Sequence, residues 1–263
     1  MKVIDPHIHI SVRTTDDYEA MHKAGYVAVV EPAFWSGSDK QYAESFLDYF
    51  NHILNFEAAR AKKYGLHHYS LICINSKEAR NPIAMEVVER MEPYLEHKNC
   101  LGVGEIGLDL ITDAEIEVFK KQVELCEKHK VLCVIHLPHI NKRVGAEIIM
   151  KILVEKKVDL NRYILDHNTE ETIGFTKQYP EMFMGMTLYP TKVSIERAAE
   201  MIKEYGAGNI MLNSSADWGK SYPLMVSEAA RTLTEFGVSA EDAEKVTYSN
   251  AVRFYSQSPK FKI

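Results

Sequence analysis

Short apolar runs rich in β-branched residues alternate along this chain with longer segments whose apolar residues recur every three or four positions. The first pattern predicts buried strands and the second predicts amphipathic helices. Eight strands are expected, at Lys2–Ile10, Tyr26–Glu31, His67–Asn75, Leu101–Leu108, Val131–Leu137, Tyr163–His167, Phe183–Tyr189 and Asn209–Ser214.

Helical periodicity is clear between these runs. From Ala114 to Lys130, apolar residues such as Phe119 and Val123 fall on one face. A second helix is expected to start at a Ser194 cap and to end at Gly206, a residue suited to the left-handed conformation after a helix.

The polar and aromatic segment Ser38–Gly65 is longer than one barrel helix requires. Two helices, an insertion covering the barrel mouth and one long outer helix all fit its sequence. This choice stays open at the level of sequence.

Alternation of strands and helices implies a parallel sheet, and eight repeats in this length match a single-domain (β/α)8 TIM barrel over residues 1–263. A doubly wound open sheet is the competitor. It would usually carry a Gly-rich phosphate turn after an early strand, and none follows Val3–Ile10. We find no linker or repeat that would split the chain.

Composition narrows the classes of function. Lys and Arg number 31 and Asp and Glu 37, which gives a net charge of −6. Such a chain lacks the positive field that drives non-specific nucleic-acid binding, so a small or modestly charged substrate is favoured. No apolar run approaches the roughly 20 residues of a membrane helix, and the opening MKVIDPHIHI has no apolar signal core. We therefore expect a soluble, cytoplasmic protein without membrane insertion.

The four cysteines show no metal-binding or disulfide spacing. They are expected to be buried free thiols in a reducing compartment. They are Cys73, Cys100, Cys126 and Cys133.

Polar residues follow several of the predicted strands, where the loops of a barrel converge on the active site. His7 and His9 are two residues apart, so on a strand both imidazoles face the same side. Glu105 lies between Gly104 and Gly107 within an apolar run. A buried carboxylate is costly without a partner or a metal, and the glycines let other groups approach it.

Three further strands end in the same manner, and together they complete a set of possible metal ligands. Imidazole and carboxylate groups bind Zn²⁺, Mn²⁺ and Fe²⁺, and six of them with one shared carboxylate could hold two ions. The six residues are His7, His9, Glu105, His136, His167 and Asp217.

This pattern resembles the TatD-like metal-dependent hydrolases of the amidohydrolase superfamily. The resemblance spans nearly the whole chain and rests on six segments. These are His7-Ile8-His9, the hexapeptide GEIGLD from Gly104 to Asp109, the histidines closing strands five and six, Asp217, and Asn250-Ala251 near the end.

The resemblance implies that His7, His9 and Asp217 hold one divalent ion, that His136 and His167 hold the other, and that Glu105 bridges them. One or two ions are expected, with Zn²⁺ as the first choice and Mn²⁺, Mg²⁺ or Fe²⁺ as alternatives. Members of this branch are described as deoxyribonucleases or phosphoesterases, and the wider superfamily hydrolyses amides, lactones and phosphotriesters. The sequences IHLPHIN and LDHNTEE depart from the usual signatures of the branch at strands five and six.

The expected chemistry is hydrolysis of a phosphoester or a small-molecule ester by water whose pKa a metal ion lowers. Glu105 and Asp217 are the predicted catalytic residues, with Asp217 as both ligand and general base. Four residues in loops after strands could bind the substrate anion or stabilise developing charge. They are His139, Arg143, Tyr189 and Lys220.

Candidates for supporting contacts to the ligands are His68, Asn75 and Asp166, but Asp166 is the one that strand geometry disfavours. Asp166 precedes His167 directly, and adjacent strand residues face opposite sides, so its side chain is predicted to point toward the helices. The segment Glu31-Pro32-Ala33-Phe34-Trp35 indicates a pocket for something small and aromatic or apolar.

Two alternatives remain open: an amide or lactone hydrolase, and a non-hydrolytic metal-binding barrel serving a biosynthetic or transport pathway. Glu170 and Glu171 beside the site disfavour an extended nucleic acid. The oligomeric state has no sequence signal.

Overall fold

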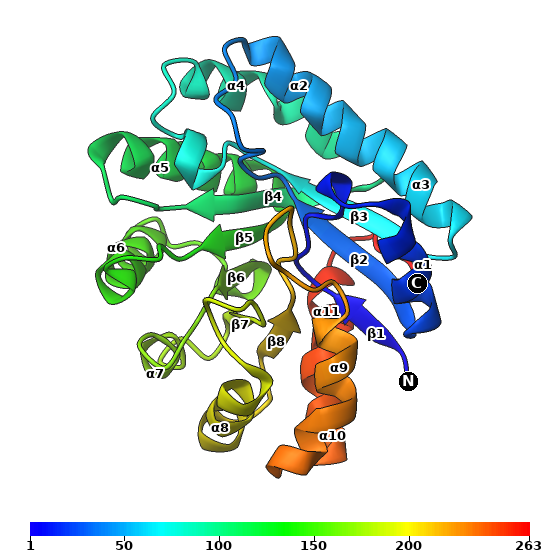
Figure 1. Ribbon diagram of the computed structural model, residues 1–263. Helices are drawn as coiled ribbons and strands as arrows, with labels where there is room; N and C mark the ends of the chain where they lie inside the picture. Colours follow the sequence, from blue (N-terminus) through cyan, green and yellow to red (C-terminus); the bar gives the residue numbers. More distant parts are fainter.

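Eight parallel strands lie side by side in one sheet, in the order in which they occur in the chain (Figure 1). The structure, a computed structural model, describes residues 1–263. The strands are β1 Val3–Asp5, β2 Tyr26–Pro32, β3 His67–Ile72, β4 Cys100–Gly107, β5 Leu132–His136, β6 Tyr163–Asp166, β7 Phe183–Thr187 and β8 Ile210–Asn213. All eight predicted strands are present, and the prediction of a (β/α)8 barrel is confirmed.

The helices surround the sheet (Figure 1), and none of them is long and apolar enough to cross a bilayer. They are α1 Thr15–Lys23, α2 Ala43–Asn51, α3 Ala58–Lys63, α4 Ala84–Arg90, α5 Asp113–His129, α6 Lys142–Glu155, α7 Ile173–Thr176, α8 Ile195–Tyr205, α9 Met225–Thr232, α10 Ala240–Glu244 and α11 Asn250–Tyr255.

Helix α8 begins and ends where its sequence predicts, and α5 buries the face that its sequence predicts. Ser194 caps α8, because its side chain accepts a hydrogen bond from the backbone N–H of Arg197 at 3.2 Å. Gly206 follows the helix with a φ of 79°. In α5 the face that carries Phe119 and Val123 is buried, as its periodicity requires.

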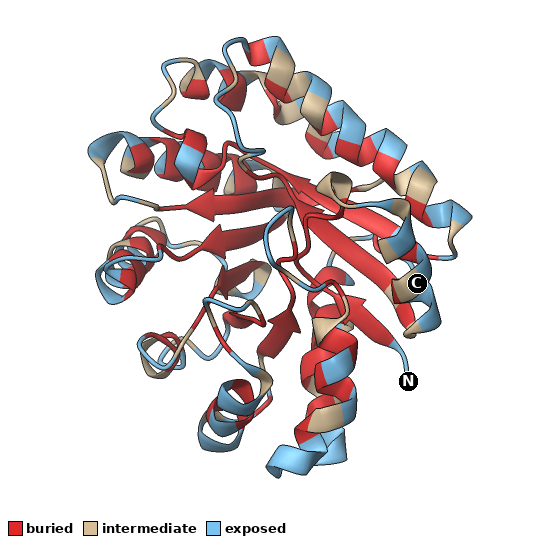
Figure 2. Ribbon diagram, in the orientation of Figure 1, coloured by how far each residue is buried: buried red, intermediate tan, exposed pale blue.

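The segment after β2 forms one long outer helix. Helix α2, a π-helical stretch at His52–Glu57 and α3 follow one another without a break. Figure 1 shows them along the outside of the barrel, and Figure 2 shows buried residues alternating with exposed ones along this run. Phe46 and Phe50 bury completely against the sheet. Of the three arrangements left open by the sequence, the single outer helix is the one observed.

Apolar side chains fill the layer between strands and helices, where Phe50, Phe119 and Ile149 are fully buried. All four cysteines are buried and free, as predicted. Burying such a layer is the main favourable contribution to folding.

Strand β1 is shorter than its apolar pattern predicts and ends at Asp5. It has no ladder with β8. The segments just beyond the two strands close the barrel instead: the N–H of Ser215 donates to the carbonyl of His7 at 2.8 Å, and the N–H of His9 donates to that of Ala216 at 2.9 Å. The predicted histidine pair therefore lies in this seam, just past the strand.

The chain's last helix fixes the entry to β8. The side-chain amide of Asn250 is buried and donates to the carbonyls of Ala207 and Ile210, each at 2.7 Å. Both acceptors would lose a partner in a buried setting if the amide were removed.

We expect Asn250→Ala to lower the free energy of unfolding by about 1–3 kcal/mol, the cost of leaving buried polar groups unsatisfied. Urea denaturation followed by circular dichroism measures this. Asn161→Ala is the matched control: Asn161 is exposed, and its replacement should change stability by about 0.5 kcal/mol or less. Equal effects of the two variants would contradict this account of Asn250.

Candidate metal centre

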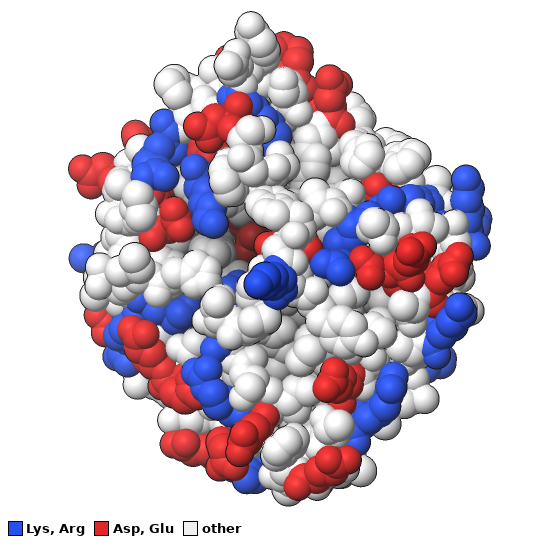
Figure 3. All heavy atoms as spheres, in the orientation of Figure 1, with Lys and Arg blue, Asp and Glu red and all other residues white.

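A cavity of about 360 Å³ opens where the carboxyl ends of the strands meet. Figure 3 shows a hollow in the middle of one face of the molecule, with acidic atoms inside it and basic side chains around it. Five of the six predicted ligands line the cavity, and the sixth, His7, contacts them from behind. The five are His9, Glu105, His136, His167 and Asp217.

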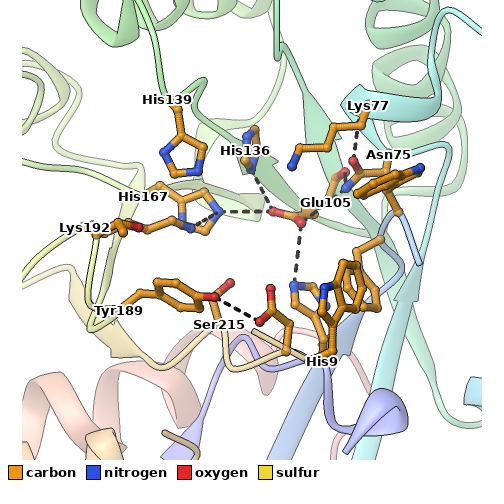
Figure 4. A pocket seen from close by; sticks show the side chains of 15 residues that line it. His9, Asn75, Lys77, Glu105, His136, His139, His167, Tyr189, Lys192 and Ser215 are labelled. Carbon is orange, nitrogen blue, oxygen red and sulfur yellow. Dashed lines mark hydrogen bonds and ion pairs between the residues drawn. The ribbon is translucent and has the colours of Figure 1, made fainter. Parts of the chain in front are cut away.

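Glu105 lies at the centre of this arrangement (Figure 4). Its Oε2 is 3.0 Å from Nδ1 of His136 and 3.2 Å from Nε2 of His167. Its Oε1 is 3.7 Å from Nε2 of His9 and accepts a hydrogen bond from the amide of Asn75 at 3.2 Å. One carboxylate thus touches imidazoles that come from opposite sides of the barrel.

Three groups of side chains hold donor atoms close enough to share a metal ion, since the donor atoms in each lie within 4.8 Å of one another. Two of the groups share Glu105, in the way that a bridging carboxylate would. The groups are His7 with His9 and Glu105, Glu105 with His136 and His167, and His7 with Asp166 and His167.

The ring nitrogens of His7 and His9 have distinct partners. Their Nε2 atoms face each other at 3.1 Å, while Nδ1 of His7 bonds to Asp166 and Nδ1 of His9 lies 3.2 Å from the carbonyl of Pro32. A carboxylate or carbonyl behind an imidazole fixes the ring and leaves the other nitrogen for a metal. Both rings face the same side, as predicted, although strand alternation does not set their direction, because β1 ends at Asp5.

His136 supplies the clearest sign that this site is built for a further group. Its Nδ1 contacts Glu105, but its Nε2 is buried and has no hydrogen-bond partner. A buried polar atom without a partner is costly. The residues present therefore fit a divalent cation in both the chemistry and the direction of their donors.

Asp166 corrects one sequence prediction. Its carboxylate points into the barrel, where Oδ2 bonds His7 and Oδ1 accepts from Asn213 at 2.9 Å. The expected alternation fails because His167 has a φ of 61°, a left-handed conformation that breaks the strand. Gly185 makes the room, since a Cβ there would lie 1.9 Å from Oδ1 of Asp166.

Gly107, two residues after Glu105, permits the close approach of β4 and β5. At Gly107 a Cβ would lie 2.2 Å from the carbonyl oxygen of His136 on β5. Only glycine allows this contact, which keeps the ends of β4 and β5 close enough for their side chains to meet. The interpretation of the flanking glycines as sites of close approach is confirmed here.

The protonation states of Glu105, His9 and His167 suit metal binding. Burial would raise the pKa of Glu105, but the imidazoles of His7 and His136 hold it well below its usual range. Burial, with His7 nearby, lowers the pKa of His9 to about 3. Burial and the ammonium of Lys192 lower that of His167. Burial would lower the pKa of His7, but the carboxylates of Glu105 and Asp166 raise it above its usual value. An ionised carboxylate and neutral imidazoles are the forms that bind a metal, so His7 would release its proton when an ion binds.

Asp217 lines the same cavity but belongs to none of the three groups of donors. Its Oδ1 accepts hydrogen bonds from the Tyr189 hydroxyl at 3.0 Å and from the Gly219 N–H at 2.7 Å. These contacts fix one oxygen of the carboxylate at the cavity wall.

The remaining predicted residues divide between the cavity and the rest of the molecule. His139 and Tyr189 line it. Arg143 does not and instead contacts Glu147 at 2.7 Å. Lys220 lines a separate groove, between α8 and α9.

Of the predicted supporting contacts near strand three, Asn75 bonds Glu105, whereas His68 lies elsewhere. The His68 side chain is buried and bonds Glu31 at 2.8 Å. It is therefore no part of the metal centre.

Two lysines at the cavity escaped the sequence analysis. Lys192, after β7, places its Nζ 3.1 Å from Nδ1 of His167, and Lys77, after β3, lines the opposite side (Figure 4). Burial lowers the pKa of Lys192 to about 8 against the attraction of Glu105 and Asp166. Their positions after strands were the only sequence signal for a place at the cavity. That signal is weak, because lysines are common in surface loops.

Histidine and carboxylate donors gathered at the carboxyl ends of parallel barrel strands define a metal-dependent hydrolase. The chain belongs to the family described as TatD related DNase, whose model matches residues 4–256. It is a hydrolase of the TatD and amidohydrolase type, as the motifs at strands one and four indicated.

Similar proteins cover nearly the whole chain. An uncharacterised metal-dependent hydrolase of Methanocaldococcus jannaschii is 28% identical over 96% of this chain and 99% of its own length. A solved TatD-like protein from Archaeoglobus fulgidus is 26% identical, with a TM-score of 0.80 over 96% of this chain and 99% of that one.

A more distant structure shares the fold. The phosphotriesterase homology protein of Escherichia coli, solved with phosphate in its active site, is 14% identical. Its TM-score is 0.67 over 97% of this chain and 98% of that chain.

The position of Glu105 generates a prediction about metal content. After incubation with Zn²⁺ or Mn²⁺ and removal of free ions, we expect about two ions per wild-type chain and one or none in Glu105→Ala, because both donor groups lose their shared carboxylate. Elemental analysis measures this. Glu89→Ala, which removes an exposed carboxylate of α4, should bind like the wild type, and unchanged metal content in Glu105→Ala would contradict the bridging arrangement.

Asp166 generates a second prediction. We expect Asp166→Asn to weaken metal binding by about 10- to 100-fold, because the carboxylate that orients His7 loses its charge. Gly185→Ala should act in the same direction by displacing that carboxylate. Competition with a chromogenic chelator gives the affinities. Asp48→Asn, on the exposed face of α2, serves as the control, and wild-type affinity in both test variants would refute the role of Asp166.

Proposed function

We propose that this protein is a metal-dependent hydrolase of small phosphoesters. The observation that carries the proposal is the Glu105 carboxylate with buried imidazoles on both sides of it, at the base of a cavity that two lysines also line. Buried donors of this kind suit a divalent ion, and the lysines suit an anion beside it.

The residues that would hold metal are His7 and His9 on one side, His136 and His167 on the other, and Glu105 between them. Zn²⁺ is the first choice for this mixture of imidazole and carboxylate, with Mn²⁺, Fe²⁺ and Mg²⁺ as alternatives. When bound, such ions lower the pKa of water and polarise the oxygen of the bond to be cleaved.

Asp217 is the proposed general base. Its Oδ1 is held by Tyr189 and Gly219, so the carboxylate is oriented before substrate arrives, and it can take a proton from the attacking water. The sequence resemblance also gives this residue a metal-binding role. Its absence from the three groups of donors favours proton transfer as its main role.

The lysines favour a phosphoester over a neutral amide or lactone. Lys192 and Lys77 line two sides of the cavity, and Lys192 lies within 3.3 Å of both ring nitrogens of His167. An ammonium beside an anionic oxygen stabilises the charge that a phosphoryl group carries and develops during hydrolysis. A cavity of about 360 Å³ suits a small molecule. An extended nucleic acid is disfavoured by this size and by the charge of −6.

Turnover of three substrate classes tests the proposal. The metal-loaded protein is expected to hydrolyse bis-p-nitrophenyl phosphate and small phosphate monoesters faster than a panel of lactones and amides. Chelation should abolish the activity and restored metal should recover it. Faster turnover of lactones or amides would replace the phosphoester assignment, and no turnover of any class would favour the non-hydrolytic barrel.

Asp217 provides the matched variant. We expect Asp217→Asn to lower kcat by about 10²- to 10⁴-fold, the usual contribution of a general base, while metal content stays at the wild-type level. Asp48→Asn should leave both quantities unchanged. Loss of an ion together with activity would assign Asp217 to the metal ligands, and full activity in Asp217→Asn would exclude it as the base.

A further inference from the structure

Three aromatic side chains form one wall of the cavity, called here the aromatic wall: Phe34, Trp35 and Trp218. Phe34 stacks on the imidazole of His9, with ring centroids 3.8 Å apart and planes 14° apart. Trp218 in turn lies 5.2 Å from Phe34 at 30°. Stacked rings therefore lead from a proposed metal ligand out to the rim of the cavity.

The outer part of this wall is accessible to a ligand. Trp218 is 49% exposed, and Trp35 lies 6.0 Å from it at an angle of 65°. Neither indole N–H donates a hydrogen bond within the chain. Packing alone does not require two tryptophans here, because Phe34 is the one buried ring of the three. Exposed aromatic faces beside a cavity are typical binding surfaces for flat apolar groups.

Positive charge lies close to the same wall. The Nζ of Lys77 is 5.5 Å from the centroid of the Trp35 ring, and Lys192 lies across the cavity near His167 (Figure 4). A ligand that touched both features would carry a negative group directly attached to a flat ring. An aliphatic ester would contact the two lysines but leave the aromatic surface exposed to water.

We propose that the aromatic wall stacks against a single aromatic ring of the substrate, whose phosphate lies between Lys77 and Lys192, so that the preferred substrates are small aryl phosphoesters. This inference rests on the proposed function and adds the substrate class to it. In the reaction, the oxygen of water bonds to phosphorus and the bond from phosphorus to the aryl oxygen breaks. The ring then leaves as a phenol that has gained one proton.

The chain offers a direct readout of the wall. Its two tryptophans are Trp35 and Trp218, both in the wall, so tryptophan emission, excited at wavelengths that the tyrosines do not absorb, reports on this cavity. The probes are phenylphosphonate, cyclohexylphosphonate and methylphosphonate, which share a charged group that cannot be hydrolysed. They differ in having a flat ring, a puckered ring of similar size or no ring.

With the metal-loaded protein, we expect phenylphosphonate to quench the emission saturably and to bind about tenfold more tightly than the other two, since stacking on an aromatic side chain typically contributes such a factor or more. Calorimetry should show this preference lost in Trp218→Ala and in Trp35→Ala. Trp218→Phe, which keeps a ring, should retain most of it. Tyr222→Ala removes an exposed aromatic residue outside the cavity and should retain all of it.

Equal affinities for the three probes, or a preference for the phenyl group that survives both alanine variants, would overturn the inference. Binding and turnover are measured separately, so the two proposals can fail independently. A stacking preference without turnover of any phosphoester would remove the proposed function and leave the wall as a binding surface. If alkyl and aryl phosphoesters were hydrolysed with equal kcat/KM and the three probes bound equally, the proposed function would stand and the aryl preference would be refuted.

Discussion

The buried negative charge of Glu105 is the constraint on which the rest of this site depends. A carboxylate removed from water is several kcal/mol too costly unless other groups replace its hydration. Here the imidazoles of His136 and His167, that of His9 from the segment after β1, and the amide of Asn75 take that role. The arrangement is stable as a set, since the removal of one member leaves the others buried without partners.

That constraint extends into the backbone. Gly107 allows β4 to approach β5, and Gly185 leaves space for Asp166 behind His7. His167 adopts a left-handed conformation so that it and Asp166 both face the interior. Positions distant from the cavity in sequence therefore share one geometric task, which is to bring nitrogen and oxygen donors within reach of a cation.

The sequence predicts much of this because hydrophobic periodicity locates strands and because the ends of parallel strands converge. The eight strands, the cap at Ser194 and the clustering of Glu105 with the histidines all follow from those two facts. Local backbone conformation is harder to predict from sequence. No residue near His167 indicates a positive φ, so the predicted direction of Asp166 is wrong. The role of His68 was equally hard to predict, because a histidine that pairs with Glu31 has the same position in the sequence as one that supports a metal ligand. The lysines at the cavity were missed for a third reason, since a flexible side chain in a loop has no periodicity to read.

The seam between β8 and β1 links metal binding to the stability of the barrel. No ladder joins these strands, and the segments that follow them are bonded through His7, His9, Ser215 and Ala216. Donors contributed by residues 7 to 167 would make a bound ion a cross-link between the first strand of the chain and its middle. An ion that binds only the folded chain stabilises that state according to its concentration and affinity. The supply of metal would then set how firmly the segment after β1, which forms one side of the seam, is held to the middle of the barrel.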